Sequence, residues 1–314
     1  MYDTLDIIAI GESLIELSSE ERLSTSQCLF KYYGGDALVC AIAAQRLGAK
    51  VGFVTRVGND AFKDFLMDSW QAEGLDISQV KVADGPNGLY IIATPSNSEP
   101  ELIYYRKKIA PSKLSIEDVP EDYIKKARLV YASGITQSLS LSAREAVSKM
   151  FETARANSIL TAYDPNYSSA INTPENAKEY FYDIANNLDI LFMNTKYDTN
   201  SILELDSVEN IIKKLWDMGI SIVVLKSKEK EGYYTGYNGN IAFTEFYTKE
   251  VVDTTCSGDA FNGAFMYAVT NGYTPFEAAK LAAITAGIQA KGVGAVKSVP
   301  HAEDVFAVYT KGGN

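Results

Sequence analysis

A short segment of the sequence, VVDTTCSGDAFNGAF at residues 251–265, combines small turn residues, one acid and the start of an apolar helical pattern. Ligands of open α/β sheets bind beyond the carboxyl ends of strands, where helices begin and their free amides point outward. Because EVVD reads as a strand before the small residues, we expect the amides around Cys256, Ser257 and Gly258 to form an anion hole. Asp259 would accept a proton from a substrate hydroxyl, as phosphoryl transfer requires.

The same segment also fits a purely structural interpretation. Thr255 or Ser257 would cap the helix with its side chain, and Asp259 would complement the helix dipole. The motif by itself does not separate the two interpretations.

The rest of the chain predicts the elements that position this segment. Glycines at positions 48, 74 and 219 end helical patterns, where a left-handed residue is favoured. Apolar runs rich in β-branched residues alternate with these helices, and such runs are typical of buried parallel strands. The runs lie at 5–10, 50–55, 128–133, 158–163, 189–194 and 221–226. The alternation predicts a single α/β domain over 1–314, with a doubly wound, mostly parallel sheet and helices on both faces.

Two segments do not follow this alternation of strands and helices, because they read as short strands without a helix between them. They lie at about 13–33 and 86–109, and the second contains a Pro/Ser/Asn turn. We expect them to form a small antiparallel β flap, or lid, on the main domain.

Composition narrows the class of protein. The 314 residues are 46% hydrophobic and 22% charged, as in ordinary globular proteins, and no run approaches a membrane span. The net charge of -11 argues against nucleic acid as a partner. Three scattered cysteines predict neither a disulfide framework nor a zinc site, and with no basic leader they favour the cytoplasm.

Several motifs together resemble those of a known family. DTTCSGDAF is similar to the DTxGAGDxF signature of the ribokinase-like (PfkB-type) carbohydrate kinases, and YYGGDALVCAIAAQRLGAKVGFVTRVGNDAFKDFL resembles their N-terminal GG signature. The likeness covers nearly the whole chain. Within the family, GESLIEL, SGI and ELIYYRKKIAPSKLS most resemble 2-keto-3-deoxygluconate kinases, with fructokinases next.

The resemblance implies transfer of the ATP γ-phosphate to a hydroxyl of a sugar or sugar acid, with Mg²⁺ as cofactor and K⁺ as a further candidate. It also implies a homodimer or higher homo-oligomer formed through the lid. It assigns Asp259 as the base, Gly34, Gly35, Tyr90, Tyr104 and Arg106 to the substrate, Asn194, Lys226, Ala283 and Gly294 to the nucleotide, and Asp253 and Thr255 to a monovalent cation. Without the resemblance, Arg106 would read as a solvated flap residue.

The chain also departs from the family pattern. Val39 stands where the family has a sugar-binding Asn, and Ser168 stands where it has an Arg. Tyr197 replaces the Glu of the NxxE motif, and Cys256 replaces a Gly. The Gly-rich phosphate loop is replaced by the charged segment 227–231. These departures favour a second hypothesis, a sugar- or nucleotide-binding member with little kinase activity. A neutral ketose is an alternative substrate, because Ser168 removes a partner for a carboxylate.

The Cys256 thiol has two interpretations. At a helix N-terminus its pKa is expected to fall, which predicts a reactive thiolate. The alternative is an inert, partly buried small residue.

Overall fold

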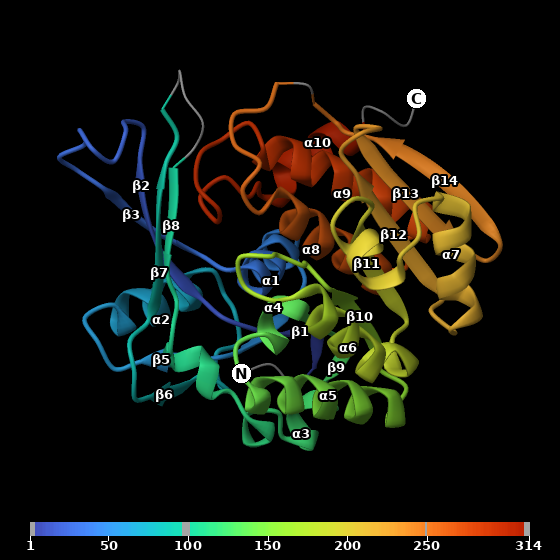
Figure 1. The fold of residues 1–314 in the computed structure, drawn as a ribbon, viewed down its shortest axis with the longest axis horizontal. Helices are drawn as coiled ribbons and strands as arrows, with labels where there is room; N and C mark the ends of the chain where they lie inside the picture. Colours follow the sequence, from blue (N-terminus) through green and yellow to red (C-terminus); the bar gives the residue numbers. More distant parts are fainter. Residues whose placement is uncertain (1–3, 96–100, 249, 311–314) are drawn as a thin grey trace.

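The computed structural model describes residues 4–95, 101–248 and 250–310. Their main sheet has eight strands in the order β14-β13-β12-β11-β10-β9-β1-β4 (Figure 1). The strands from β12 to β4 in this order pair in parallel, and β13 and β14 add an antiparallel edge. Their bounds are β1 Leu5–Ile10, β4 Val51–Val54, β9 Ala127–Ser133, β10 Leu160–Asp164, β11 Ile190–Asn194, β12 Ile222–Ser227, β13 Gly232–Tyr237 and β14 Asn240–Glu245. The predicted doubly wound, mostly parallel sheet is confirmed.

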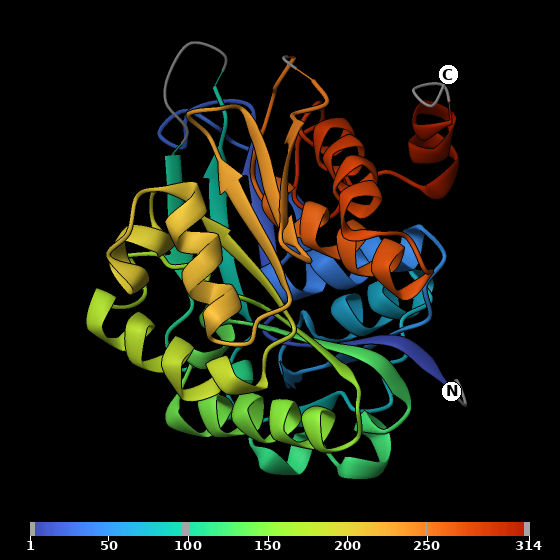
Figure 2. The ribbon, with the colours of Figure 1, turned by 90° about the vertical axis from the view of Figure 1, so that its right-hand side faces the viewer.

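Helices cover both faces of this sheet (Figure 2). Their bounds are α1 Asp36–Arg46, α2 Lys63–Ala72, α3 Glu121–Ile124, α4 Gly134–Gln137, α5 Leu141–Ala156, α6 Pro174–Ile184, α7 Val208–Asp217, α8 Ser257–Thr270, α9 Pro275–Gln289 and α10 Ala302–Tyr309. Short helical turns lie at η1 Ala110–Lys113, η2 Ile116–Asp118, η3 Ala185–Asn187 and η4 Thr199–Leu203. One apolar core joins the sheet to α1, α8 and α9, and a second joins its other face to α5, α6 and α7. No helix of the described chain is long and apolar enough to cross a membrane.

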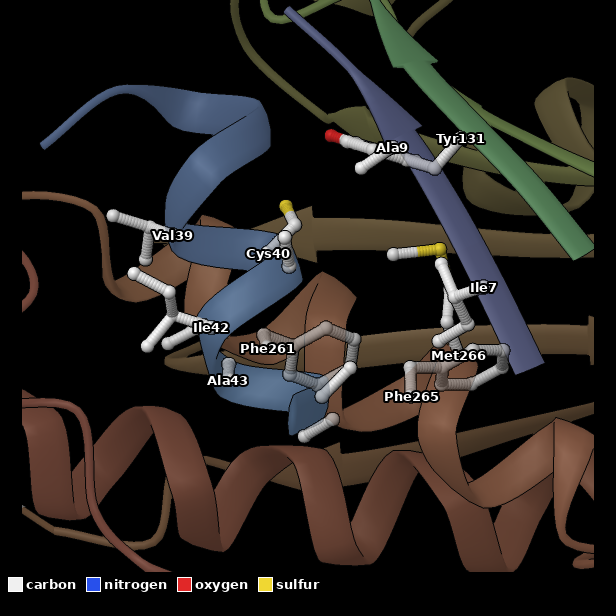
Figure 3. Packing of buried hydrophobic residues seen from close by; sticks show 14 of the residues in the cluster. Ile7, Ala9, Val39, Cys40, Ile42, Ala43, Tyr131, Phe261, Phe265 and Met266 are labelled. Atoms are coloured by element: carbon white, nitrogen blue, oxygen red, sulfur yellow. The ribbon is translucent and has the colours of Figure 1, made fainter. Parts of the chain in front are cut away.

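Helix α8 is held deep in the first core. Its apolar residues pack against α1 beside β1 and β9, as Phe261 and Phe265 do in Figure 3. The two helices approach closely at Gly263, where a Cβ atom would lie 2.2 Å from the carbonyl oxygen of Cys40. This contact fixes α8, and with it the residues at its N-terminus.

The lid is a separate four-stranded sheet in the order β3-β2-β7-β8, which stands away from the main domain (Figure 1). Its strands are β2 Leu14–Ser19, β3 Phe30–Gly34, β7 Gly88–Ala93 and β8 Glu101–Tyr105, and β5 Arg56–Gly58 pairs with β6 Lys81–Ala83 nearby. The outer pairings are antiparallel, as expected, but β2 and β7 are parallel. Local turn signals do not reveal this pairing, because α1, β4 and α2 separate the two strands. The predicted Pro/Ser/Asn turn extends into 96–100, outside the described residues.

The segment before α8 is not the strand that EVVD suggests. The amides of Val252 and Asp253 donate to the carbonyl oxygen of Ala290, and neither residue belongs to a sheet. Val251 and Val252 are exposed, so their β-branched side chains do not mark a buried strand. The chain therefore reaches α8 through an extended loop held by the residues after α9.

Candidate active site

The N-terminus of α8 has the form of an anion site. Cys256, directly before the helix, adopts a left-handed conformation with φ 59° and makes no side-chain capping bond. The Ser257 amide donates to Thr254 at 3.1 Å, whereas the amides of Cys256 and Gly258 have no acceptor within the described chain. Side-chain capping by Thr255 or Ser257 is therefore wrong. Of the three predicted anion-hole residues, Cys256 and Gly258 offer free amides.

Asp259 lies in the first turn of α8 and lines two cavities at once. Burial and the nearby charge of Asp36 raise its pKa to about 8, although Lys226 opposes the shift. A carboxyl group with such a pKa can take up a proton near neutral pH, as a general base does. Its place between the cavities fits transfer from one bound molecule to the other.

The first of these cavities, of about 270 Å³, we call the phosphate-side cavity. Two predicted nucleotide residues line it, Asn194 and Lys226. The Lys226 ammonium bonds Asp164 at 2.5 Å and lies 3.4 Å from where a side chain on Gly258 would begin. Burial opposes its charge, yet Asp164 raises the pKa of Lys226 overall. A permanent cation thus stands beside free helix amides, which together attract phosphate.

The same cavity contains acidic oxygens that suit a divalent cation. Asp164 and Asp198 both line it, and Asp198 accepts backbone bonds from Asn194 at 2.6 Å and Tyr167 at 2.9 Å. Burial and the charge of Asp164 raise the pKa of Asp198 to about 7. The described residues contain no cluster of three or more His, Cys, Asp or Glu fit for a metal ion. Since Mg²⁺ is commonly held by one or two carboxylates plus phosphate oxygens, this pair fits that ion.

Tyr197, at the position of the expected Glu, is half exposed and carries no charge. Its neighbour Asp198 is buried and brings a carboxylate to the cavity instead. The charged loop at 228–231 is exposed, and within it Lys228 lines the cavity.

The second cavity, of about 230 Å³, lies on the other side of Asp259 and we call it the sugar-side cavity. It is lined by the predicted residues Gly35, Tyr90, Tyr104 and Arg106. Arg106 pairs with the buried carboxylate of Glu12, and its own side chain is 13% exposed. Arg106 is therefore a wall of the cavity and not a solvated flap residue.

The two glycines of the GG signature act differently. Gly35 has φ 131°, and a Cβ atom there would lie 2.5 Å from the carbonyl oxygen of Glu12. Gly34 lies behind the cavity wall, where a side chain would meet the Tyr90 hydroxyl at 2.9 Å. Both positions exclude side chains and so bring the lid strands close to β1.

Of the other predicted residues, Thr255 lines the sugar-side cavity, and the rest are not part of the lining of either cavity. Ala283 is buried in the α9 core, and Val39 is likewise buried in α1. Gly294 approaches Asp253, whose carboxylate lies 3.5 Å from the Gly294 amide and accepts the Thr255 amide at 2.8 Å. Asp253 and Thr255, the two residues expected to bind a monovalent cation, thus lie together beside Gly294.

The structure adds polar residues to which the motifs gave no role: Glu12, Asp36, Asp164 and Asn166. All four line the cavities, and each follows or ends a parallel strand or begins α1. Polar residues at the carboxyl ends of parallel strands are a signal that could have found them.

The predicted low pKa of Cys256 is wrong. Burial, together with the charge of Asp259 and a hydrogen bond to it, raises the pKa of this thiol well above its usual value. At Cys256, burial and the neighbouring carboxyl group outweigh the effect of the helix N-terminus. The alternative of an inert, partly buried residue fits better.

A carboxyl group between two cavities, free helix amides and a lysine form the kind of arrangement that phosphoryl transfer requires. The chain belongs to the pfkB family of carbohydrate kinases, whose model matches residues 4–302. It is 32% identical to the 2-dehydro-3-deoxygluconokinase of Thermoproteus tenax, over 88% of this chain and 86% of that one. It is 28% identical to the 5-dehydro-2-deoxygluconokinase of Clostridium beijerinckii, over 96% and 91% of the two chains.

Solved structures with a similar fold are also found. A protein named ribokinase II from E. coli, solved in complex with ATP and Mg²⁺, matches with a TM-score of 0.89 at 21% identity. The match covers 98% of this chain and 99% of that one, which confirms the ribokinase-like fold.

Proposed function

We propose that this protein transfers the γ-phosphate of ATP to a hydroxyl of a six-carbon sugar or sugar acid, with Asp259 as the base. The single observation that carries this proposal is the position of Asp259, which lines the phosphate-side and sugar-side cavities together. The family and the named relatives support the same reaction.

Each site residue has a part in this reaction. Asp259 accepts the proton of the attacking hydroxyl, and the free amides of Cys256 and Gly258 hold negative charge on the transferred group. Lys226, held by Asp164, points a cation toward the same place. Asp164 and Asp198 would hold Mg²⁺, which would neutralise the charge of the phosphoryl group that ATP supplies.

Two substrate groups fit the sugar-side cavity. A sugar acid such as 2-dehydro-3-deoxygluconate is favoured by Tyr104 and Arg106 and by the name of one relative. A neutral ketose is favoured by Ser168, which lines the cavity without a charge.

The hypothesis of a binding protein with little activity rests on the departures from the family pattern. Two of them, Tyr197 and the charged 227–231 segment, contribute residues to the lining of the phosphate-side cavity. Asp259, Lys226 and the free amides nevertheless remain in place, which favours an active kinase.

Three further proposals accompany the reaction. K⁺ would bind near Asp253 and Thr255, which lie together beside Gly294. The protein would form homo-oligomers through the exposed apolar side chains of the lid. It would work in the cytoplasm, where ATP is available.

The experiment is ADP release by the purified protein with a panel of ketoses and sugar acids. We expect release that depends on both sugar and Mg²⁺. Release at the background rate with every sugar would contradict the kinase and favour the binding protein.

A further inference from the structure

Carboxyl groups dominate the charge of the sugar-side cavity. Glu12, Asp36 and Asp259 all line it, and among its described lining residues Arg106 alone is basic. Three acids therefore face one cation in the space that the substrate enters.

The one cation is already committed. Arg106 pairs with Glu12, whose side chain is 2% exposed, and its guanidinium lies 5.6 Å from the Tyr104 ring centre. A substrate carboxylate would have to share the single positive charge of Arg106 with Glu12, and it would add a further negative charge beside three acids. Weakening a buried pair and adding a like charge next to it is unfavourable.

Two of these acids each have one carboxyl oxygen without a hydrogen-bond donor, although their other oxygens accept from Arg106 and Asn166. Oε2 of Glu12 and Oδ1 of Asp36 are buried and, within the described chain, neither accepts a hydrogen bond of normal geometry. An unsatisfied buried acceptor is costly, and a sugar hydroxyl can donate to it. A carboxylate has no hydrogen to donate and would add a further acceptor.

Apart from Arg106, the described residues that line the cavity supply no cation. Ser168 and Ile171 line it and also line a second, small hollow. The other described residues around that hollow are uncharged as well, including Tyr167, Asn172 and Tyr180. None of these residues offers a positive charge to a substrate carboxylate.

We propose that the site selects uncharged sugars and rejects sugar acids, because Glu12 and Asp36 are acceptors for two substrate hydroxyls while Arg106 serves Glu12. This inference rests on the proposed kinase function. It assigns Glu12 and Asp36 to substrate selection and separates this chain from relatives named for sugar acids.

A matched pair of sugars tests the proposal. 3-Deoxy-D-fructose and 2-keto-3-deoxy-D-gluconate differ only at the first carbon, which carries a hydroxymethyl group in one and a carboxylate in the other. The test is done at pH 8, above the pKa of about 7 that burial gives Glu12. At this pH the side chain of Glu12 is charged and pairs with Arg106. We expect kcat/KM for the neutral sugar to be at least about tenfold higher, equivalent to about 1.4 kcal/mol. Equal or better use of the acid would overturn the proposal.

Variants of the cavity sharpen the test. Glu12→Gln frees Arg106 and Ser168→Arg adds a cation, so each should shift the ratio of kcat/KM values toward the acid. Glu101→Gln makes the same charge change on β8, outside the cavity lining, and should leave the ratio unchanged. An equal shift in all three variants would show that only the net charge of the protein matters. That result would overturn the assignment of Glu12 and Asp36 to substrate selection.

Binding separates this proposal from the kinase itself. If neither sugar releases ADP, the kinase function fails, and calorimetric titration of each sugar into the protein still decides the selectivity. Tighter binding of the neutral sugar supports the proposal. Tighter binding of the acid, or no binding of the neutral sugar, overturns it.

Discussion

Asp259 is a carboxyl group in an unfavourable place for its own charge. Burial and Asp36 raise its pKa to about 8, and Lys226 only partly offsets them. The protonated form cannot act as a base, so raising the pH through this value increases the active fraction. Its burial near another acid lowers stability when the carboxyl group ionises, and the proposed role as a base gives a reason for this position.

This predicts a pH profile. With a neutral sugar, kcat/KM should rise about tenfold per pH unit below pH 8 and level off above it. The measurement is initial ADP release between pH 6 and pH 9.5 with saturating Mg²⁺. A flat profile across pH 7 to 9 would show that another group, or none, limits the reaction.

The raised pKa of Cys256 predicts a slow thiol. Cys28 is exposed and Cys256 only partly so, and burial, followed by the nearby Asp259, disfavours the Cys256 thiolate. Iodoacetamide at neutral pH should therefore label Cys28 well before Cys256, as peptide mass analysis can follow. Faster labelling of Cys256 would restore the reactive-thiolate interpretation.

At the scale of elements, the position of Asp259 depends on how α8 packs against α1. Their contact at Gly263 leaves no space for a side chain, because the obstacle is the backbone of Cys40. A substitution there must move one helix, and α8 carries Asp259 and the free amides at its N-terminus.

Gly263→Ala should therefore lower both stability and activity. Overpacking of this kind costs about 1–3 kcal/mol of unfolding free energy. The melting temperature and kcat measured on the same preparation check this. An unchanged melting temperature with full activity would mean that α1 and α8 are not held as closely as the structure shows.

Elements also show where the sequence was sufficient and where it was not. The six predicted strands of the parallel sheet are present, because each is apolar on both faces and bounded by turn residues. EVVD has the same composition but lies exposed, since burial depends on what packs above it. The parallel pairing of β2 with β7 is equally invisible, because residues far apart in the chain decide it.

The residues of the candidate site also divide into those that the sequence could place and those that it could not. Asp259 and Gly258 could be placed from their motif, because a helix start constrains them locally, whereas Arg106 could be placed only through the family resemblance. Glu12 and Asp36 gained their importance only from their convergence on one cavity. The raised pKa of Cys256 likewise depends on burial and on a neighbour's orientation, which spacing along the chain does not specify.

At the scale of the whole molecule, the lid exposes an unusual amount of apolar surface. Phe30, Leu102, Ile103 and Tyr105 are between 43% and 62% exposed, and they lie on strands of one small sheet. Exposed apolar patches often mark protein interfaces. We expect two copies of the chain to associate through this sheet.

Light scattering coupled to size exclusion should give a mass above that of one chain, and Ile103→Glu should reduce it to the monomer mass. Lys280→Glu, on α9 away from the lid, makes a charge change as a control. A monomeric wild-type protein at high concentration would contradict assembly through the lid.

The account as a whole depends on proton transfer to Asp259, and Asp259→Asn measures this most directly. The substitution keeps shape and removes the proton acceptor, so kcat should fall about 100- to 10,000-fold. Calorimetric binding of a non-hydrolysable ATP analogue should persist. The melting temperature should not fall, because burial disfavours the charged carboxylate that is removed. A folded variant that keeps more than half of the wild-type kcat would show that Asp259 is not the base.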